Sequence, residues 1–484
     1  MTRRKSLRVS PSPPVSVNPL IREPIPGLVR RISVPVSVGM FFQTMYNVVD
    51  TWAAGRISTE ALAALTASFP VFFLMIAVAH GSQAATNALI SHALGREDAD
   101  TARELAGQSL FFGTWASVTT GLAGWFSAPT LFRLLGVDGL TAELALSYMR
   151  TLFWATPFIV LSSTLNGMLM ARGNTRPFRD SLILGFFANI VLDLWFVFGG
   201  WGLPAMGFQG IARATVLLQG LTTLYLWIST VRAGLIPPSG FAHLHPRRKA
   251  QLRLISQGFP AGLNMLTIAV GIFVFTYYAG TLGTQVLAAY GTAMRIEQLA
   301  LLPTIGLNSA AMTLAGHSYG ARRPDRLRET VLTCLKFGGV IYLVGAPLVA
   351  GFAPYWMGLF SSDPEVIAIG STILRIAMIT LYAYVILFTA TSTLQGLQRP
   401  QFAIWMGLFR QLFLPVLLVP FLMNRLHPSH LGIWFGSFSA VWAGALLTLA
   451  YLFRTWRKLR AEFEHPPFPS GSPPDPTQKA FDIA

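Results

Sequence analysis

The sequence predicts an all-α polytopic membrane protein with twelve transmembrane helices, arranged as two parallel six-helix repeats around a central cavity. The first observation behind this prediction is composition. Of 484 residues, 53% are hydrophobic and only 12% are charged, whereas soluble proteins carry roughly 25% charged residues. The second is a series of long apolar runs, and the third is an internal repeat that relates the two halves of the chain. Together they exclude a soluble globular fold.

Twelve apolar runs lie between polar segments or Gly and Pro residues, and each is predicted to form one membrane-spanning helix. About 20 apolar residues are enough to cross a bilayer as a helix, so every run is long enough. The predicted helices cover residues 28–52, 59–82, 105–129, 142–170, 179–199, 208–231, 252–280, 284–312, 327–353, 366–395, 401–423 and 431–455. Because their number is even, both ends of the chain lie on the same side of the membrane.

Five segments of the chain follow from these helices. They are a disordered cytoplasmic tail (1–27), an N-terminal six-helix lobe (28–232), a basic cytoplasmic linker (233–251), a C-terminal six-helix lobe (252–456) and a second cytoplasmic tail (457–484). The first tail holds basic residues and prolines without the apolar core of a signal peptide, and the second is rich in proline. Both are therefore predicted to be disordered.

The distribution of basic residues gives the orientation. The formal net charge is +16, but Lys and Arg gather at helix ends rather than among aromatic residues on a polar surface, so no nucleic-acid partner is expected. Alternate loops hold Arg96, Arg103, Arg172, Arg176, Arg179, Arg232, Arg247, Arg248, Lys249, Arg253, Arg322, Arg323, Arg326, Arg328 and Arg399. The opposite loops hold little more than Arg56, Arg133 and Arg425. The positive-inside rule then predicts a multi-pass protein of the cytoplasmic (inner) membrane with both termini in the cytoplasm.

The internal repeat has an offset of 225 residues, the interval from Thr59 to Thr284. Residues 59–64 read TEALAA and residues 284–289 read TQVLAA. Further identities at the same offset pair Gly81, Ala85, Leu89, His92, Gly95, Asp100, Arg103 and Glu104 with Gly306, Ala310, Leu314, His317, Gly320, Asp325, Arg328 and Glu329. Because each repeat holds an even number of helices, the two are parallel and related by an axis along the membrane normal, as in secondary transporters.

Polar side chains in the first predicted helix mark one of its faces. Gln43, Tyr46, Asn47 and Asp50 recur at helical spacing and therefore share that face, which is expected to look into a cavity. A charged side chain in a membrane costs about 2.5–3.5 kcal/mol on insertion scales, so each one calls for a reason. A cap, or an arginine near the interface, is the structural alternative for Asp50.

The fifth and sixth helices add oxygen ligands. Asn189 and Asp193 are stacked one turn apart, and Thr215 stands on the sixth helix. Carboxylates, an amide and a hydroxyl can bind a small cation or hold a shared proton. A purely structural role is the alternative for Asp193.

Other polar groups favour structural roles. Glu297, in the eighth helix, is expected to form a structural pair, with cation or substrate binding as the alternative. His92 and His317 are expected to anchor loops rather than bind metal. Arg150 and its repeat mate Arg375 are expected to snorkel or brace a lobe.

Pro35 removes a hydrogen bond from the first helix and predicts a kink, either static or acting as a hinge.

Several motifs resemble the multidrug and toxic compound extrusion (MATE) family, and its DNA-damage-inducible bacterial branch in particular. They are YNVVDT at 46–51 followed by Gly55, residues 59–64, residues 81–95, LNG at 165–167, RGNTRP at 172–177 and NIVLD at 189–193. The resemblance covers both halves and excludes only the tails. Arg213 departs from it, because the family usually has an aliphatic residue there. The seventh helix also departs, since it lacks the acidic residue that another branch carries, and this places any ion site in the N-terminal half.

The resemblance implies a cation-coupled antiporter, driven by H⁺ or Na⁺, that exports amphipathic cationic organic compounds by alternating access. Its N-lobe cation site carries over onto Asp50, Asn189, Asp193 and Thr215, where Na⁺ is the candidate metal. Gln43 and Asn166 match residues that line the family's cavity, and Pro35 matches a proline at which the first helix bends. We expect no catalysis and no cofactor, a monomer, and drug-like small molecules and the lipid bilayer as partners. A lipid-linked saccharide flippase and, more distantly, an intramembrane prenyltransferase are the alternatives.

Overall fold

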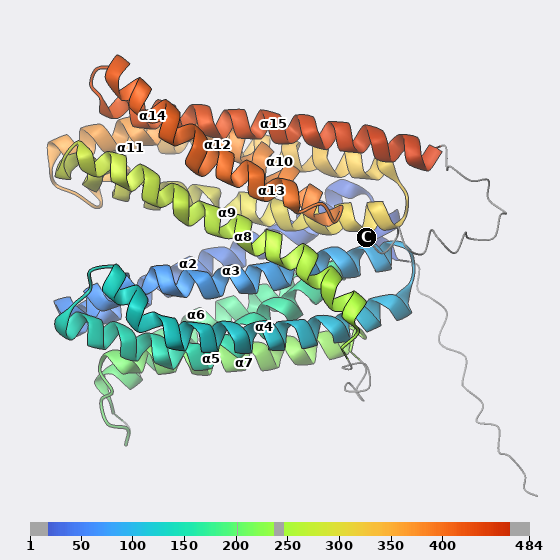
Figure 1. Ribbon diagram of the computed structural model, residues 1–484, viewed down its shortest axis with the longest axis horizontal. Coiled ribbons are helices and arrows are strands. Elements are labelled where there is room, and N and C mark those ends of the chain that lie inside the picture. The colour runs from blue at the N-terminus through green and yellow to red at the C-terminus, as the bar shows by residue number, and fades with distance from the viewer. Residues whose placement is uncertain (1–17, 201, 237–245, 465–484) are drawn as a thin grey trace, which may run out of the picture.

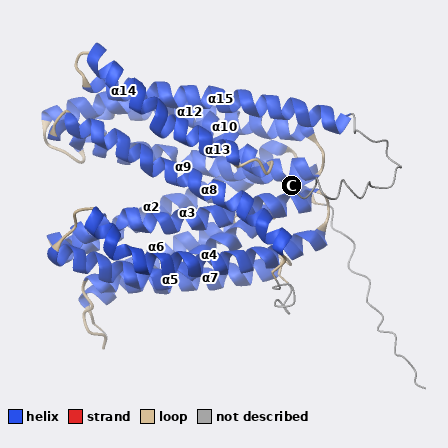
Figure 2. Ribbon diagram, in the orientation of Figure 1, coloured by secondary structure: helices blue, strands red, loops and turns tan. Residues whose placement is uncertain are grey.

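The computed structural model describes residues 18–200, 202–236 and 246–464. In these residues the chain is helical almost throughout and contains no β-strand, only an isolated bridge between Gly200 and Leu203 (Figure 2). The helices are α1 (Pro19–Arg22), α2 (Ile25–Ile57), α3 (Thr59–Gly95), α4 (Ala99–Leu134), α5 (Gly139–Ala171), α6 (Arg176–Phe198), α7 (Phe208–Arg232), α8 (Arg248–Thr281), α9 (Thr284–Gly320), α10 (Pro324–Gly351), α11 (Ala353–Gly358), α12 (Pro364–Gly396), α13 (Gln401–Leu408), the π-helix η1 (Phe409–Phe413), α14 (Leu414–Arg425) and α15 (His430–Glu464).

Eleven helices of the described chain are long and apolar enough to cross a membrane, with α13, η1 and α14 counting as one continuous span. The twelfth predicted span is α4, which is 36 residues long but rich in Gly, Ser and Thr, and these residues lower its mean hydropathy. The predicted fold class is confirmed. Figure 1 shows the lobes as two layers of helices, α2–α7 in one and α9–α15 in the other, with α8 crossing obliquely between them.

Local chemistry sets the helix boundaries. Ser58 ends α2 and starts α3, where its hydroxyl accepts the Ala61 N–H at 3.0 Å. Asp98 does the same for α4, accepting the N–H of Thr101 at 2.9 Å and its hydroxyl at 2.7 Å. These caps satisfy N–H groups that have no partner within their own helix.

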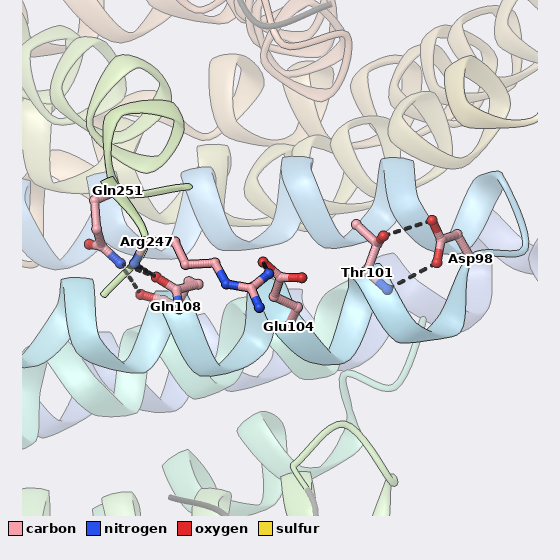
Figure 3. A network of polar contacts seen from close by, with 6 residues as sticks. All are labelled: Asp98, Thr101, Glu104, Gln108, Arg247 and Gln251. Atoms are coloured by element: carbon pink, nitrogen blue, oxygen red, sulfur yellow. Dashed lines mark hydrogen bonds and ion pairs between the residues drawn. The ribbon is translucent and has the colours of Figure 1, made fainter. Parts of the chain in front are cut away.

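The end of the linker docks onto α4 (Figure 3). Gln108 accepts hydrogen bonds from the Arg247 N–H and the Gln251 side chain, both at 2.9 Å, and Arg247 pairs with Glu104. α8 therefore starts against the N-terminal lobe. Residues 237–245 of the predicted linker lie outside the described chain.

The two lobes meet along a seam that follows the sequence repeat. The carbonyl oxygen of Gly258 on α8 lies only 2.4 Å from where a Cβ of Gly81 on α3 would stand. At the equivalent place, the Ser33 carbonyl oxygen on α2 lies 2.3 Å from a Cβ position at Gly306 on α9. Ser33 and Gly258 are themselves related by the repeat offset, so each lobe's first helix contacts the second helix of the other lobe.

The same reciprocity closes one end of the seam. A Cβ on Gly95, the last residue of α3, would lie 2.4 Å from the His317 carbonyl oxygen, and a Cβ on Gly320 would lie 2.2 Å from that of His92. The His317 ring also contacts the Ala171 carbonyl oxygen at 2.8 Å. Both histidines therefore lie at helix ends, as predicted, and they pack across the lobes.

Part of each predicted tail is helical. Residues 18–27 form α1 and the start of α2, where Leu20 is 2% exposed because it packs against the N-terminal end of α2 and α9. Asn18 donates to the Leu94 carbonyl oxygen at 2.9 Å, and Arg326 donates to that of Glu23 at 2.8 Å. Residues 457–464 continue α15. Residues 1–17 and 465–484 lie outside the described chain.

Candidate functional site

A group of polar side chains gathers inside the N-terminal lobe, near the face where α2 and α6 end and α7 begins. α2 contributes Tyr46 and Asp50, α6 contributes Asn189 and Asp193, and α7 contributes Thr215. Helical periodicity places both members of each pair on one side of their helix. Asp50 is 8% exposed, Asp193 1% and Asn189 0%. The three helices thus bring together the predicted cation-binding residues and Tyr46.

Two hydrogen bonds organise this group. The Asn189 amide donates to Oδ1 of Asp50 at 3.0 Å, which joins α6 to α2. The Tyr46 hydroxyl donates to Oγ1 of Thr215 at 3.1 Å, which joins α2 to α7. The carboxyl groups of Asp50 and Asp193 are near enough to interact electrostatically. Within the described chain no lysine or arginine forms an ion pair with either carboxyl group, so the alternative of an arginine partner finds no support there.

Three buried oxygens of the group, namely Oδ1 and Oδ2 of Asp193 and Oδ1 of Asn189, accept no well-formed hydrogen bond in the described chain, although Asp193 lies close enough to interact with Asp50 and Asn189. Burying an unpartnered polar group is costly, and burying an unpaired charge costs far more. A proton on the carboxyl pair, or a small cation among the oxygens, would remove this cost. Hard oxygen ligands of this kind suit a cation such as Na⁺.

Three predicted cavity residues are not part of this group. Gln43 is half-buried and Asn47 is exposed, and neither side chain has a hydrogen bond to the group in the described chain. Asn166 is buried, with an unpartnered Oδ1, but it lies near the last turn of α5. α5 begins at the membrane face where α2 ends, so a helical rise of 1.5 Å per residue separates Asn166 from Asp50 by roughly 30 Å along the lobe.

Tyr148 joins the site without having been predicted. It lies on α5, is buried, stacks on Phe208 with ring centroids 5.1 Å apart, and interacts electrostatically with Asp50 and Asp193. No polar stripe on the fourth predicted helix (142–170) marks it, and the residue at the repeat offset is Ile373. Only the packing of α5 against α7 reveals it.

Pro35 lies inside α2, which continues through it, and the residues around it touch the other lobe. The Ser37 hydroxyl donates to the Pro303 carbonyl oxygen of α9, in the other lobe, at 3.4 Å. Within the N-terminal lobe, the Thr175 hydroxyl donates to the Ile32 carbonyl oxygen at 3.1 Å. Any change in the bend of α2 at Pro35 would therefore move residues that contact the other lobe at the seam.

The C-terminal lobe holds a different cavity of about 160 Å³, lined mostly by apolar side chains. Glu297 lines it together with Arg410 and Gln411 of η1. The Arg410 guanidinium lies 5.7 Å from the ring centroid of Tyr384. Glu297 interacts electrostatically with Arg410. Glu297 thus has a basic neighbour in its cavity, but no direct ion pair joins the two in the described residues, so its structural pairing stays a prediction.

Known proteins resemble the chain over nearly its whole length. A profile of the MatE family matches residues 35–195 and 260–421. The probable multidrug resistance protein YoeA of Bacillus subtilis is 25% identical, over 88% of this chain and 93% of its own length. An FAD transporter of Shewanella oneidensis is 26% identical, over 72% and 77% respectively. A solved structure described as the outward-facing conformation of a multidrug resistance MATE family transporter matches this chain with a TM-score of 0.86 at 26% identity. The alignment covers 92% of this chain and 99% of that one.

Proposed function

The chain belongs to the MatE family and is a multidrug efflux transporter, and on this basis we propose that it is an antiporter that couples the entry of H⁺ or Na⁺ to the export of amphipathic cationic organic compounds. The observation that carries the proposal is the pair of buried carboxyl groups of Asp50 and Asp193, which lie close together without an ion pair to a basic side chain in the described chain. We further propose that the protein is a monomer in the inner membrane. The basic loops support an orientation with both termini in the cytoplasm. Neither the flippase nor the prenyltransferase alternative is favoured.

The proposed coupling is electrostatic. Two buried carboxyl groups attract a cationic substrate and repel each other, and a proton or Na⁺ relieves both effects. Cation binding would then release the substrate to the outside, and the neutralised lobe could close by alternating access. The available driving force is roughly 1.4 kcal/mol per pH unit, plus about 2.3 kcal/mol for each 100 mV per net charge moved across the membrane. Exchange of one H⁺ or Na⁺ for one monovalent substrate moves no net charge, so the ion gradient alone drives it, and a tenfold ion gradient supports about a tenfold substrate gradient.

Transport in sealed vesicles tests the proposal. Purified protein would be reconstituted, and ethidium movement followed with a pH gradient and a Na⁺ gradient imposed separately. We expect one of the two gradients to drive transport, and Asp50→Asn and Asp193→Asn each to abolish the driven component. If neither gradient drives wild-type transport, the antiport proposal is wrong.

Asp180→Asn is the matched control, because Asp180 lies on the same helix as Asp193 but is partly exposed and paired with Arg179. It should retain wild-type rates. Wild-type rates from Asp193→Asn would instead remove that residue from the coupling site, even if the chain proves to be an antiporter.

A further inference from the structure

A second polar depression opens on the outside of the N-terminal lobe, between α4, α5 and α7. Its volume is about 570 Å³. Its polar lining comprises Glu143, Ser147, Arg150, Thr151, Gln209 and Arg213. It plays no part in the proposed coupling, because none of these side chains has a described hydrogen bond to Asp50 or Asp193.

The two guanidinium groups of this depression are exposed and lack a carboxylate partner in the described chain. Arg150 lies over the Trp125 ring, 5.4 Å from its centroid, and Arg213 contacts the Met206 sulfur at 3.2 Å. Glu143 lines the same depression but forms no ion pair with either arginine. The depression therefore carries a net positive charge.

The neutral polar side chains of the depression already bond to one another. The Thr151 hydroxyl donates to Oε1 of Gln209 at 3.0 Å, and the Gln209 amide donates to the Ser147 hydroxyl. The hydrogen-bonding groups of Ser147, Thr151 and Gln209 are therefore largely occupied by one another. The unsatisfied donors that face outwards thus belong to the two arginines, and guanidinium is well suited to phosphate oxygens.

The depth of the arginines fits the boundary between lipid and water. α5 is 33 residues long, or about 50 Å, whereas the hydrocarbon core is about 30 Å thick, so about two turns of α5 can project beyond it at each end. Arg150 lies in the fourth turn of α5 and Arg213 in the second turn of α7, which places their Cα atoms just inside the core, within roughly 7 Å of its edge. Side chains on a helix lean towards its N-terminus, which directs both arginines towards the headgroups. Trp125 and Trp154, with ring centroids 6.2 Å apart, are residues of the kind that gathers at this level.

The surroundings of the depression are apolar and exposed. Trp154 is 74% exposed and Phe126 on α4 is 77% exposed. Such side chains, next to a positive depression in a membrane-spanning lobe, provide a wall for acyl chains below a site for a headgroup. An unpaired arginine facing lipid is costly, and a lipid phosphate would offset that cost.

We propose that this depression binds the headgroup of an anionic phospholipid, with Arg150 and Arg213 donating to its phosphate oxygens. In the proposed orientation the lipid belongs to the outer leaflet.

Lipid binding to the purified protein tests the inference without any transport measurement. Delipidated protein in detergent would be titrated with phosphatidylglycerol and, separately, with phosphatidylcholine, and bound lipid counted by native mass spectrometry. We expect a preference for phosphatidylglycerol that falls about fivefold in Arg213→Leu and again in Arg150→Gln. Arg213→Lys should keep most of it.

Arg133→Leu is the matched control, because Arg133 ends α4 at the same membrane face but does not line the depression. It should leave the preference unchanged. The inference is overturned by equal binding of the two lipids to wild type, by an unchanged preference in Arg213→Leu, or by an equal loss in Arg133→Leu. Displacement of phosphatidylglycerol by millimolar inorganic phosphate would identify a free-anion site and would equally overturn it. Size-exclusion profiles confirm that each variant is folded.

Discussion

The reciprocal contacts at the end of the seam predict that Gly95→Ala and Gly320→Ala loosen the closed arrangement of the lobes to a similar extent. In both cases the new Cβ meets a backbone carbonyl oxygen of the opposite lobe, at 2.4 Å for Gly95 and 2.2 Å for Gly320. Backbone atoms cannot rotate away as a side chain can. The helices must therefore separate for either methyl group to fit.

Overpacking of this kind costs about 1–3 kcal/mol. Because the strain exists only while the lobes touch, it raises the population of the open seam by about 5- to 150-fold. The double variant should give less than the product of the two effects, since a Cβ on Gly320 would also lie 3.0 Å from the Cα of Gly95. One separation of the helices relieves both clashes.

A buried thiol at the seam can measure this population. Ser91 on α3 is fully buried, and its Cβ lies 2.7 Å from where a Cβ of Gly316 on α9 would stand. Ser91→Cys, in a Cys334→Ala background that removes the native buried thiol, should react with a maleimide only when the seam opens. The labelling rate of purified protein should rise by the same factor as the open population.

Gly345→Ala on α10 is the control, because a Cβ there meets nothing within 4 Å. Its labelling rate should equal that of the parent. Unchanged labelling in both seam variants would refute the proposed role of the reciprocal contacts, and so would an equal increase in Gly345→Ala. A response to only one of the two would show that the seam is not reciprocal.

Three further predictions concern single side chains. Pro35→Ala should slow ethidium turnover more than it weakens ethidium affinity, because it restores a helical hydrogen bond and stiffens α2; equal losses would indicate a packing defect. Glu297→Gln should keep gradient-driven efflux within a few-fold of wild type, and loss of efflux in a folded variant would extend coupling into the C-terminal lobe. Hydrogen bonds from the Thr101 N–H and hydroxyl lower the pKa of Asp98, so its stabilising effect is present above its ordinary pKa of about 4 and is lost as the pH falls through the lowered value. Asp98→Ala should therefore cost about 1 kcal/mol at neutral pH and progressively less in acid, and thermal-shift curves that differ from wild type equally at every pH would contradict this.

Helical periodicity accounts for much of what the sequence predicted at the site. The pairs Tyr46 with Asp50 and Asn189 with Asp193 each share a helix face, and the structure brings these faces together with Thr215. Periodicity defines a face but not the height along the lobe. Asn166 entered through the family resemblance, whereas the direction of the fourth predicted span (142–170) already places it near the opposite membrane face.

Features that depend on contacts between helices could not be predicted from the sequence. The π-helix η1 buries Arg410 and Gln411, yet residues 401–423 read simply as one apolar run. Residues 18–27 are polar enough on average to predict disorder, but Leu20 and Ile25 find an apolar partner surface at the N-terminal end of α2 and α9. Similarly, the sequence shows that Gly95 and Gly320 are repeat mates, but it does not show that each packs against a histidine of the opposite lobe.

The two halves of the repeat therefore make equivalent contacts between the lobes, but they carry different charged side chains. At the repeat offset Asp50 corresponds to Phe275, while the acidic Glu297 of the C-terminal lobe shares its cavity with Arg410. A cation added to the N-terminal lobe changes an uncompensated pair of carboxyl groups, whereas one added to the C-terminal cavity would meet a charge already balanced.

A ligand shifts a conformational equilibrium only if it interacts differently with the two states. α2 provides the connection that this requires, because Asp50 lies near one of its ends and Ser33, which touches Gly306 of the other lobe, lies near the opposite end. Pro35 stands next to that contact, so a change in helix bend caused at Asp50 would reach the seam through a single continuous helix. α8, the repeat mate of α2, makes the equivalent contact through Gly258 but has no carboxylate at the position of Asp50. The charges thus support the proposed coupling through α2 alone, although both helices touch the opposite lobe.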